Sequence, residues 1–395
     1  MSRKSGRHFL QLPGPTNVPD RVLRAMNRAV IDHRGPEFQA LGLALLENVK
    51  WVFGTRHPVF IYPSSATGAW EAALSNTLSP GDTVLAFQQG FFAERWARSA
   101  ARLGLDVRLE PWDAAVGLDP DRVKEILVAD TRREIRAVLV VHNETSTGVT
   151  TDLEAVGAAV RGSGHPALLM ADTVSSLAAT DVQHDAWGVD VTVSGSQKGL
   201  MLPPGLSFTA VSPRAMEARE TSRLPCAYWD WGDMLESNRD GFFPYTPATT
   251  LLYGLAESLE MLREEGLPNV FARHARFAEA TRWAVRGWGL EMVARSAGSF
   301  SNAVTAVRMP EGHDADAFRA VVLDRFDMSL GTGLGDLKGR VFRIGHLGDI
   351  NELTLVGTLA GVEMGLALAD VPHQGGGAAA AMDHLKETSS AGGGR

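Results

Sequence analysis

The sequence predicts an α/β fold with a mostly parallel central sheet in a large domain, followed by a smaller α+β domain near the C-terminus. Short apolar runs alternate with longer helical patterns through the first two thirds of the chain, which is typical of parallel strands joined by crossover helices. After about residue 260 the pattern changes to long amphipathic helices separated by single short apolar runs. The chain has 395 residues and is 45% hydrophobic, which suffices for two such cores.

Five short apolar segments are expected to be strands of the large sheet. They are VFIYP (59–63), TVLAF (83–87), RAVLVVH (136–142), ALLMA (167–171) and VDVTVS (189–194). Open α/β sheets bind ligands beyond the carboxyl ends of their strands, so we expect the chemistry where these segments end.

The last third of the chain predicts three helices and two strands. The helices are expected over 269–288, around 315–326 and near 352–368, and the strands at AVTAVRM (303–309) and VFRIGH (341–346). We therefore divide the chain into an N-terminal arm (1–20), a large domain (21–260), a small domain (261–372) and a Gly/Ala-rich tail (373–395). The tail is expected to be partly mobile, at least after Thr388, because it has too little apolar surface to offset the entropy of ordering.

Composition and charge argue against several classes of protein. The net charge of −8, with scattered Lys and Arg, offers no basic face for nucleic acid. The apolar runs are too short for a secretory signal or a membrane span, so we expect a cytoplasmic protein without membrane contact. Cys226 is the only cysteine, which excludes an intrachain disulfide and a thiolate metal cluster. We expect no metal site.

A lysine and an aspartate follow two neighbouring predicted strands. Lys198 follows VDVTVS within GSQKGLMLPPG, and Asp172 follows ALLMA. Taken singly, they would be a surface lysine and a carboxylate that caps a turn or helix. Because they lie about one βα unit apart, both can face one crevice, where partial desolvation would lower the pKa of the lysine. Pyridoxal phosphate (PLP) needs this pair, a lysine for an imine and a carboxylate that keeps the pyridinium nitrogen protonated.

Other strand ends offer groups for the rest of such a cofactor. The segment YPSSATGAWEAALSN places Ser65 to Gly68 between a strand and a helix, where backbone N–H groups would face an anion unless the segment is only an ordinary hydroxyl cap. Thr145, in HNETSTGV, could reach the cofactor or cap a turn. Phe92 could stack on a pyridine ring or belong to the core. Arg343, in VFRIGH, could face solvent, pair with an acid or hold a substrate carboxylate.

Taken together, these segments resemble the class V aminotransferases of the PLP-dependent fold type I, most closely the serine–glyoxylate and alanine–glyoxylate group. The motifs PGPTNVP, DHRGPEF, HNETSTGV, GSQKGLMLPPG, FFPYTP and FRIGHLGD occur in the family's order. The resemblance implies PLP as cofactor, small amino acids and 2-oxo acids as substrates, and a homodimer with shared active sites.

The resemblance also implies roles for individual residues. Lys198 would form the imine and Asp172 would hold the pyridinium nitrogen. The residues around the ring would be Val174 beneath it, Phe92 stacked on it, and Thr145 near its hydroxyl group. The phosphate would be held by Ala66, Thr67, Gly68 and Gln197, and across the dimer interface by Tyr245 and Thr246. Arg343 would hold the substrate α-carboxylate, helped by backbone near Gly14.

We expect transamination with glyoxylate as the amino acceptor. Similarity to bacterial members of the group in GFFPYTP and LLYGL favours L-serine as donor, giving hydroxypyruvate and glycine. L-aspartate and L-alanine are the alternative donors; Arg34, in DHRGP, could reach the second carboxylate of aspartate or simply cap or pair at a domain junction. A PLP lyase or desulfurase is a further alternative, but a desulfurase needs a mobile nucleophilic cysteine and Cys226 lies outside any such motif. A non-enzymatic binding protein would lack the lysine or the aspartate, and both are present.

Overall fold

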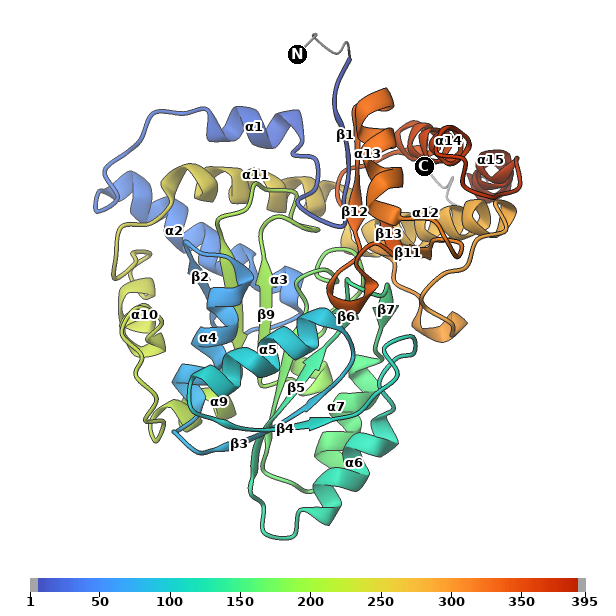
Figure 1. Ribbon diagram of the computed structural model, residues 1–395. Helices are drawn as coiled ribbons and strands as arrows, with labels where there is room; N and C mark the ends of the chain where they lie inside the picture. The colour runs from blue at the N-terminus through green and yellow to red at the C-terminus, as the bar shows by residue number, and fades with distance from the viewer. Residues whose placement is uncertain (1–5, 390–395) are drawn as a thin grey trace.

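The computed structural model describes residues 6–389, which form a larger lobe and a smaller lobe with a sheet each (Figure 1). The larger sheet has seven strands in the order β2-β10-β9-β8-β5-β3-β4. Their bounds are β2 Val59–Tyr62, β3 Thr83–Phe87, β4 Asp106–Glu110, β5 Ile135–Val141, β8 Leu168–Asp172, β9 Val191–Gly195 and β10 Ser207–Val211. Strands β9, β8, β5, β3 and β4 run parallel, whereas β10 is antiparallel to both of its neighbours. The predicted mostly parallel α/β sheet is confirmed.

The five strands predicted for the large sheet are all present, and two further strands of this sheet were not predicted. Strand β4 lies at the edge of the sheet and is largely exposed, so DVRLE lacks the apolar run that marked the others. Strand β10, SFTAV, is fully buried but short and polar at alternate positions.

Helices connect the strands of the large sheet. Their bounds are α1 Asp20–Met26, α2 Pro36–Asn48, α3 Lys50–Phe53, α4 Ala66–Thr77, α5 Phe91–Arg102, α6 Pro120–Ala129, α7 Leu153–Gly162, α8 His184–Trp187, α9 Pro213–Arg219, α10 Trp231–Asn238 and α11 Thr249–Glu265. A two-stranded ribbon, β6 Asn143–Glu144 and β7 Val149–Thr150, follows β5.

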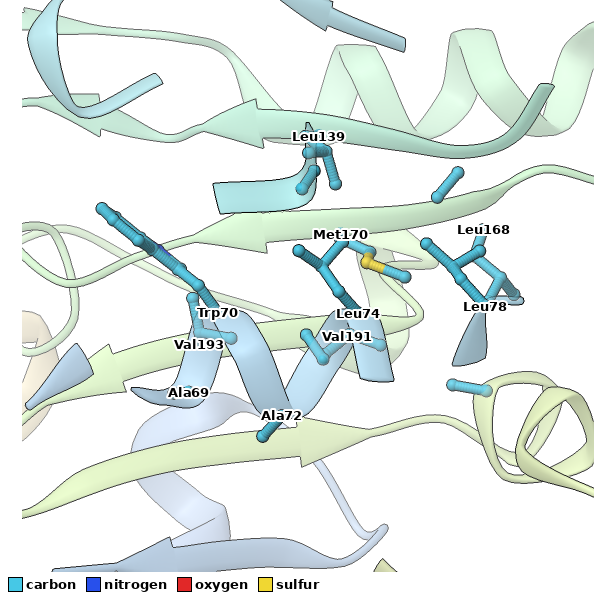
Figure 2. Packing of buried hydrophobic residues seen from close by; sticks show 14 of the residues in the cluster. Ala69, Trp70, Ala72, Leu74, Leu78, Leu139, Leu168, Met170, Val191 and Val193 are labelled. Atoms are coloured by element: carbon cyan, nitrogen blue, oxygen red, sulfur yellow. The ribbon is translucent and has the colours of Figure 1, made fainter. Parts of the chain in front are cut away.

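Helix α4 packs directly on the middle of this sheet, as Figure 2 shows. Its Trp70 and Leu74 belong to one buried cluster with Val191 of β9, Met170 of β8 and Leu139 of β5. Buried alanines between them give α4 a narrow face, which lets the helix approach the strands closely. The beginning of α4 is thereby fixed relative to the ends of β8 and β9.

The smaller sheet has the order β1-β12-β13-β11. Its strands are β1 Phe9–Gln11, β11 Val304–Arg308, β12 Met328–Thr332 and β13 Val341–Gly345, and its helices are α12 Leu267–Gly287, α13 Ala315–Phe326 and α14 Glu352–Leu368. These elements bury one apolar cluster. Strand β1 pairs in parallel with β12, so part of the expected N-terminal arm belongs to the small-domain sheet. The expected boundary at residue 260 falls inside α11.

Part of the Gly/Ala-rich tail forms a packed helix, which the sequence did not predict. Residues Gly377–Ser389 form α15, which packs on α12 and α14 and buries Ala381 and Leu385. A Cβ at Gly377 would overlap the Ala284 carbonyl oxygen and the Trp288 ring, so the helices meet through close backbone contact at this position as well as through the buried Leu385 side chain. The argument from scarce apolar surface therefore fails for this helix. Residues 390–395, on which the rest of that expectation falls, lie outside the described residues.

None of the helices in residues 6–389 is both long enough and apolar enough to cross a membrane.

Candidate active site

A cavity of about 280 Å³ lies where β8 and β9 end and α4 begins. Its lining includes Gly14, Ser65, Ala66, Thr67, Trp70, Phe92, Asn143, Thr145, Asp172, Val174, Gln197 and Lys198. A larger cavity of about 490 Å³ lies beside β1 and α1, but its described lining residues include no lysine. The smaller cavity is lined by Lys198 and Asp172, the pair predicted from the sequence, so we take it as the candidate site.

Lys198 lies in the loop after β9 and is only 8% exposed. Burial, and to a smaller extent the Arg343 charge, lower the pKa of its amine to about 7, although the Asp172 charge opposes them. A large fraction of the amine is therefore unprotonated at neutral pH, the form that acts as a nucleophile or base.

The N-terminal segment positions this lysine. Lys198 Nζ donates a hydrogen bond to the Pro13 carbonyl oxygen. Gly14 has φ +109°, and a Cβ there would lie 2.5 Å from both Cε and Nζ of Lys198. Thr16 holds the lysine loop by donating from its N–H to the Gln197 carbonyl and from Oγ1 to the Lys198 carbonyl, each at 3.2 Å. Only glycine fits at position 14 without displacing the lysine.

Asp172 is the last residue of β8 and is buried. Its Oδ1 accepts a hydrogen bond from the Val174 N–H, and its Oδ2 accepts one from Trp70 Nε1, both at 2.8 Å. Burial raises the pKa of this carboxyl more than the two hydrogen bonds and the Lys198 charge lower it, and the resulting pKa is about 6. Sequence reasoning missed Trp70; the available signal was a large aromatic side chain one helical turn after the candidate phosphate segment.

The beginning of α4 forms one wall of the cavity. Ser65, Ala66 and Thr67 line it, and Ser65 makes no side-chain cap to the helix. The Gly68 N–H donates to the Ser65 carbonyl oxygen, whereas the N–H groups of Ala66 and Thr67 have no acceptor among the described residues and are left for an anion. Gln197 also lines the cavity; its Oε1, which can only accept hydrogen bonds, is buried and has no partner among the described residues. Gly68 is not part of the lining; a Cβ there would lie 2.5 Å from the Trp229 ring, so this glycine lets the tryptophan pack on α4.

A second buried carboxylate, Glu144, was also missed. Its Oε2 accepts hydrogen bonds from the N–H groups of Phe92 (3.0 Å) and Ala93 (3.2 Å), and its Oε1 accepts from the N–H (2.9 Å) and hydroxyl (2.6 Å) of Ser146. Burial raises its pKa to about 7 against the lowering effect of these bonds. Glu144 therefore fixes the first turn of α5 and, with it, the Phe92 ring that lines the cavity.

Arg343 lies next to the cavity without lining it. Its Nη1 donates to the Thr145 carbonyl at 2.9 Å, and its Nε donates to the Thr332 carbonyl at 2.7 Å. Burial lowers its pKa only to about 10, so it remains a cation at neutral pH. Among the described residues, no carboxylate lies within salt-bridge distance of it. An anchored guanidinium without an acidic partner is suited to a carboxylate ligand.

A sequence model of the aminotransferase class-V family matches residues 8–324 of the chain. The chain belongs to this family. It is 49% identical to the serine–glyoxylate aminotransferase of Methylorubrum extorquens over 98% of each chain, and 47% identical to the L-aspartate–glyoxylate aminotransferase of Paracoccus denitrificans over 96% of each. Among solved structures, the pyridoxamine–pyruvate aminotransferase of Mesorhizobium loti has a TM-score of 0.90 at 30% identity, covering 98% of both chains. These class-V relatives confirm the predicted fold type.

Besides Gly68 and Arg343, three further predicted site residues of this class-V aminotransferase lie outside the cavity of their own chain. Tyr245 stacks on Tyr228 with ring centroids 4.4 Å apart, and its hydroxyl donates to the Met234 sulfur. Thr246 beside it is exposed. Arg34 is exposed in the loop before α2, where its Nη1 lies 2.9 Å from His33 Nε2. A single chain does not bring these side chains to Lys198.

Proposed function

We propose that the chain is a PLP-dependent aminotransferase that transfers the amino group of L-serine to glyoxylate, giving hydroxypyruvate and glycine. The observation that carries the proposal is the presence of Lys198 and Asp172 in one buried cavity, with pKa values of about 7 and about 6. PLP would supply an electron-accepting ring that stabilises negative charge at the substrate Cα.

The cavity fits PLP at both ends. At one end, the uncapped beginning of α4 suits a phosphate, and the amide nitrogen of Gln197 would be the side-chain donor to it. At the other end, Asp172 keeps a free lone pair on each oxygen beyond the bonds to Trp70 and Val174, which leaves an acceptor for a ring N–H. Between them, Phe92 and Val174 line the walls. Ala66 and Thr67 would hold the phosphate, and Thr145 would lie near the ring hydroxyl.

The chain's own groups supply the proton transfers. Lys198 Nζ, whose pKa of about 7 leaves a large fraction unprotonated at neutral pH, would take the proton from the substrate Cα as general base and return a proton as general acid. Arg343 would hold the α-carboxylate and orient Cα toward this amine. Both groups are almost completely buried, so water is excluded from the reacting atoms.

The distribution of charge favours a donor with a single carboxylate. Lys198 is the one basic side chain among the described lining residues of the cavity, and Arg343 is the one cation beside it that we assign to the substrate. The second carboxylate of aspartate would need another cation, and Arg34 lies exposed elsewhere in the same chain. The hydroxyl of serine needs only polar neighbours, which Asn143 and Thr145 provide. Aspartate remains the second candidate because of the 47% identical Paracoccus relative.

We also propose a cytoplasmic homodimer in which Tyr245 and Thr246 of each chain contact the phosphate in the partner's site. Apolar side chains on and near α1 and α2 are exposed in the single chain, including Leu23 (48%), Val30 (77%) and Leu43 (46%). Exposed apolar surface of this kind marks interfaces. Sedimentation equilibrium is expected to give twice the chain mass; a monomer with full activity would contradict the shared site.

The donor is tested by glycine formation from glyoxylate with L-serine, L-aspartate or L-alanine, measured with the purified holoenzyme. We expect kcat/KM for serine to exceed that for aspartate by at least about tenfold, the effect of one unmatched charged group. Arg34→Ala is the matched control, and serine turnover should be unchanged in it. A higher kcat/KM for aspartate that is lost in Arg34→Ala would overturn the choice of serine.

A further inference from the structure

The indole of Trp70 makes a polar contact that the proposed chemistry does not use. Trp70 lies on α4, is 3% exposed and lines the cavity. Its Nε1 donates to Asp172 Oδ2 at 2.8 Å. Its ring stacks on Trp96, with centroids 5.9 Å apart and planes inclined by 15°. Stacking against an aromatic ring restricts the rotation of the indole and so fixes the direction of its N–H bond.

An indole N–H can only donate a hydrogen bond. It therefore stabilises the carboxylate form of Asp172 and gives no comparable support to the protonated acid. The contribution of this hydrogen bond matters because two other influences on the protonation of Asp172 act in opposite directions: burial favours the neutral acid, and the Lys198 charge favours the carboxylate. Glu144 is the other acid that interacts with it. His142, whose N–H donates to the Asp172 carbonyl, has its pKa lowered to about 4 by burial and is neutral.

Helix α4 connects this contact to the other end of the cavity. Ala66 and Thr67, in its first turn, line the proposed phosphate site, and Trp70 follows one turn later on the same helix. One rigid element thus reaches both ends of the cavity. A shift of α4 would change the phosphate contacts and the Asp172 hydrogen bond together.

We propose that Trp70 is a positioning residue that holds Asp172 in its ionised form and in a fixed orientation, and thereby strengthens its grip on the ring nitrogen of PLP. The role of PLP rests on the proposed function, whereas the coupling between Trp70 and Asp172 does not.

The coupling can be measured in the protein without cofactor. The Val174 N–H donates to Asp172 Oδ1, so its resonance in 15N-valine-labelled protein should report the protonation of Asp172 as the pH is varied. In Trp70→Phe we expect the midpoint to rise by about one pH unit, a tenfold change in the acid constant, because a hydrogen bond to a charged group is lost.

Trp96→Phe is the matched control. Trp96 is buried to the same degree and stacks on Trp70, but its Nε1 has no hydrogen-bond partner among the described residues. This variant removes the same ring volume without removing a bond to Asp172, so the Val174 midpoint should stay at its wild-type value. An unchanged midpoint in Trp70→Phe, or an equal rise in Trp96→Phe, would overturn the proposal.

A wild-type measurement covers the case in which Trp70→Phe fails to fold. One of the nine tryptophan indole N–H resonances should titrate with the midpoint of Val174 and lose this titration in Asp172→Asn. If no indole resonance titrates, the proposal is wrong.

The consequence for the cofactor is tested by titrating PLP into each protein. We expect binding on the order of tenfold weaker in Trp70→Phe and within about twofold of wild type in Trp96→Phe. Equal PLP affinity in Trp70→Phe and wild type would refute the effect on the cofactor. Failure of the proposed function would look different: wild-type protein would not bind PLP, while the Val174 and indole titrations would remain.

Discussion

Replacing Gly14 with alanine should displace the lysine on which the proposed chemistry depends. The new Cβ would lie 2.5 Å from Cε and Nζ of Lys198, whereas ordinary van der Waals contact begins at 3.4 Å. The lysine end must therefore move by about 1 Å, a misplacement that can cost about 100-fold in rate. The φ of +109° at position 14 adds a backbone cost of about 1–3 kcal/mol for any residue with a side chain.

Gly81→Ala separates these two effects. Gly81 also has a positive φ (+83°), but a Cβ there would meet nothing within 4 Å. Both variants should lose comparable stability to denaturant, whereas only Gly14→Ala should show an at least about 100-fold lower kcat. If Gly14→Ala keeps the wild-type kcat, or if kcat falls as far in Gly81→Ala, the Cβ at position 14 does not displace Lys198.

Three further predictions concern other parts of the molecule. Burial raises the pKa of Glu144 from 4.5 to about 7, so the folded apoprotein binds more protons than the unfolded chain between these pH values and loses stability as the pH rises through them. Glu144→Gln lacks this proton-dependent contribution. As the pH is raised from 4.5 to 8, denaturant titrations should therefore show the free energy of unfolding of Glu144→Gln rising relative to that of wild type by up to about 3 kcal/mol. A difference in unfolding free energy that does not change with pH would show that Glu144 does not titrate as a buried acid. Arg343→Lys keeps the charge but loses the planar two-point grip, so KM for the amino donor should rise about 10- to 100-fold with less effect on kcat, and an unchanged KM would argue against a carboxylate ligand. Leu385→Ala on the buried face of α15 should cost about 2–3 kcal/mol of unfolding free energy, whereas Met382→Ala on its exposed face should cost less than about 0.5 kcal/mol; equal effects would show that α15 is not packed as described.

The sequence predicted the location of the site because parallel strands end at one edge of a sheet. Lys198 and Asp172 each follow an apolar strand, and the structure brings both to the same cavity. Trp70 and Glu144 escaped prediction because their roles depend on tertiary contacts. The direction of an indole N–H cannot be inferred from a helical pattern. Glu144 did carry a weaker signal, since it lies two residues after the apolar run RAVLVVH, at a strand end where ligands bind in open α/β sheets.

The limits of the fold prediction have similar physical causes. Strand β1 has three residues and pairs with β12, MSLGT, which contains serine and glycine; neither segment has an apolar run of its own. Helix α15 was missed because composition measures apolar side-chain area, while Gly377 packs through close backbone approach. The roles implied for Tyr245 and Thr246 require a second chain, which no pattern within one chain can position.

Whether Lys198 carries the cofactor can be tested by identifying the residue to which the cofactor is attached. The purified enzyme would be loaded with PLP, reduced with borohydride to make the attachment permanent, digested and analysed by peptide mass spectrometry. We expect one pyridoxyl phosphate adduct, on Lys198, with none in Lys198→Ala. An adduct on a different lysine, or no adduct in wild-type protein, would rule out Lys198 as the site of attachment.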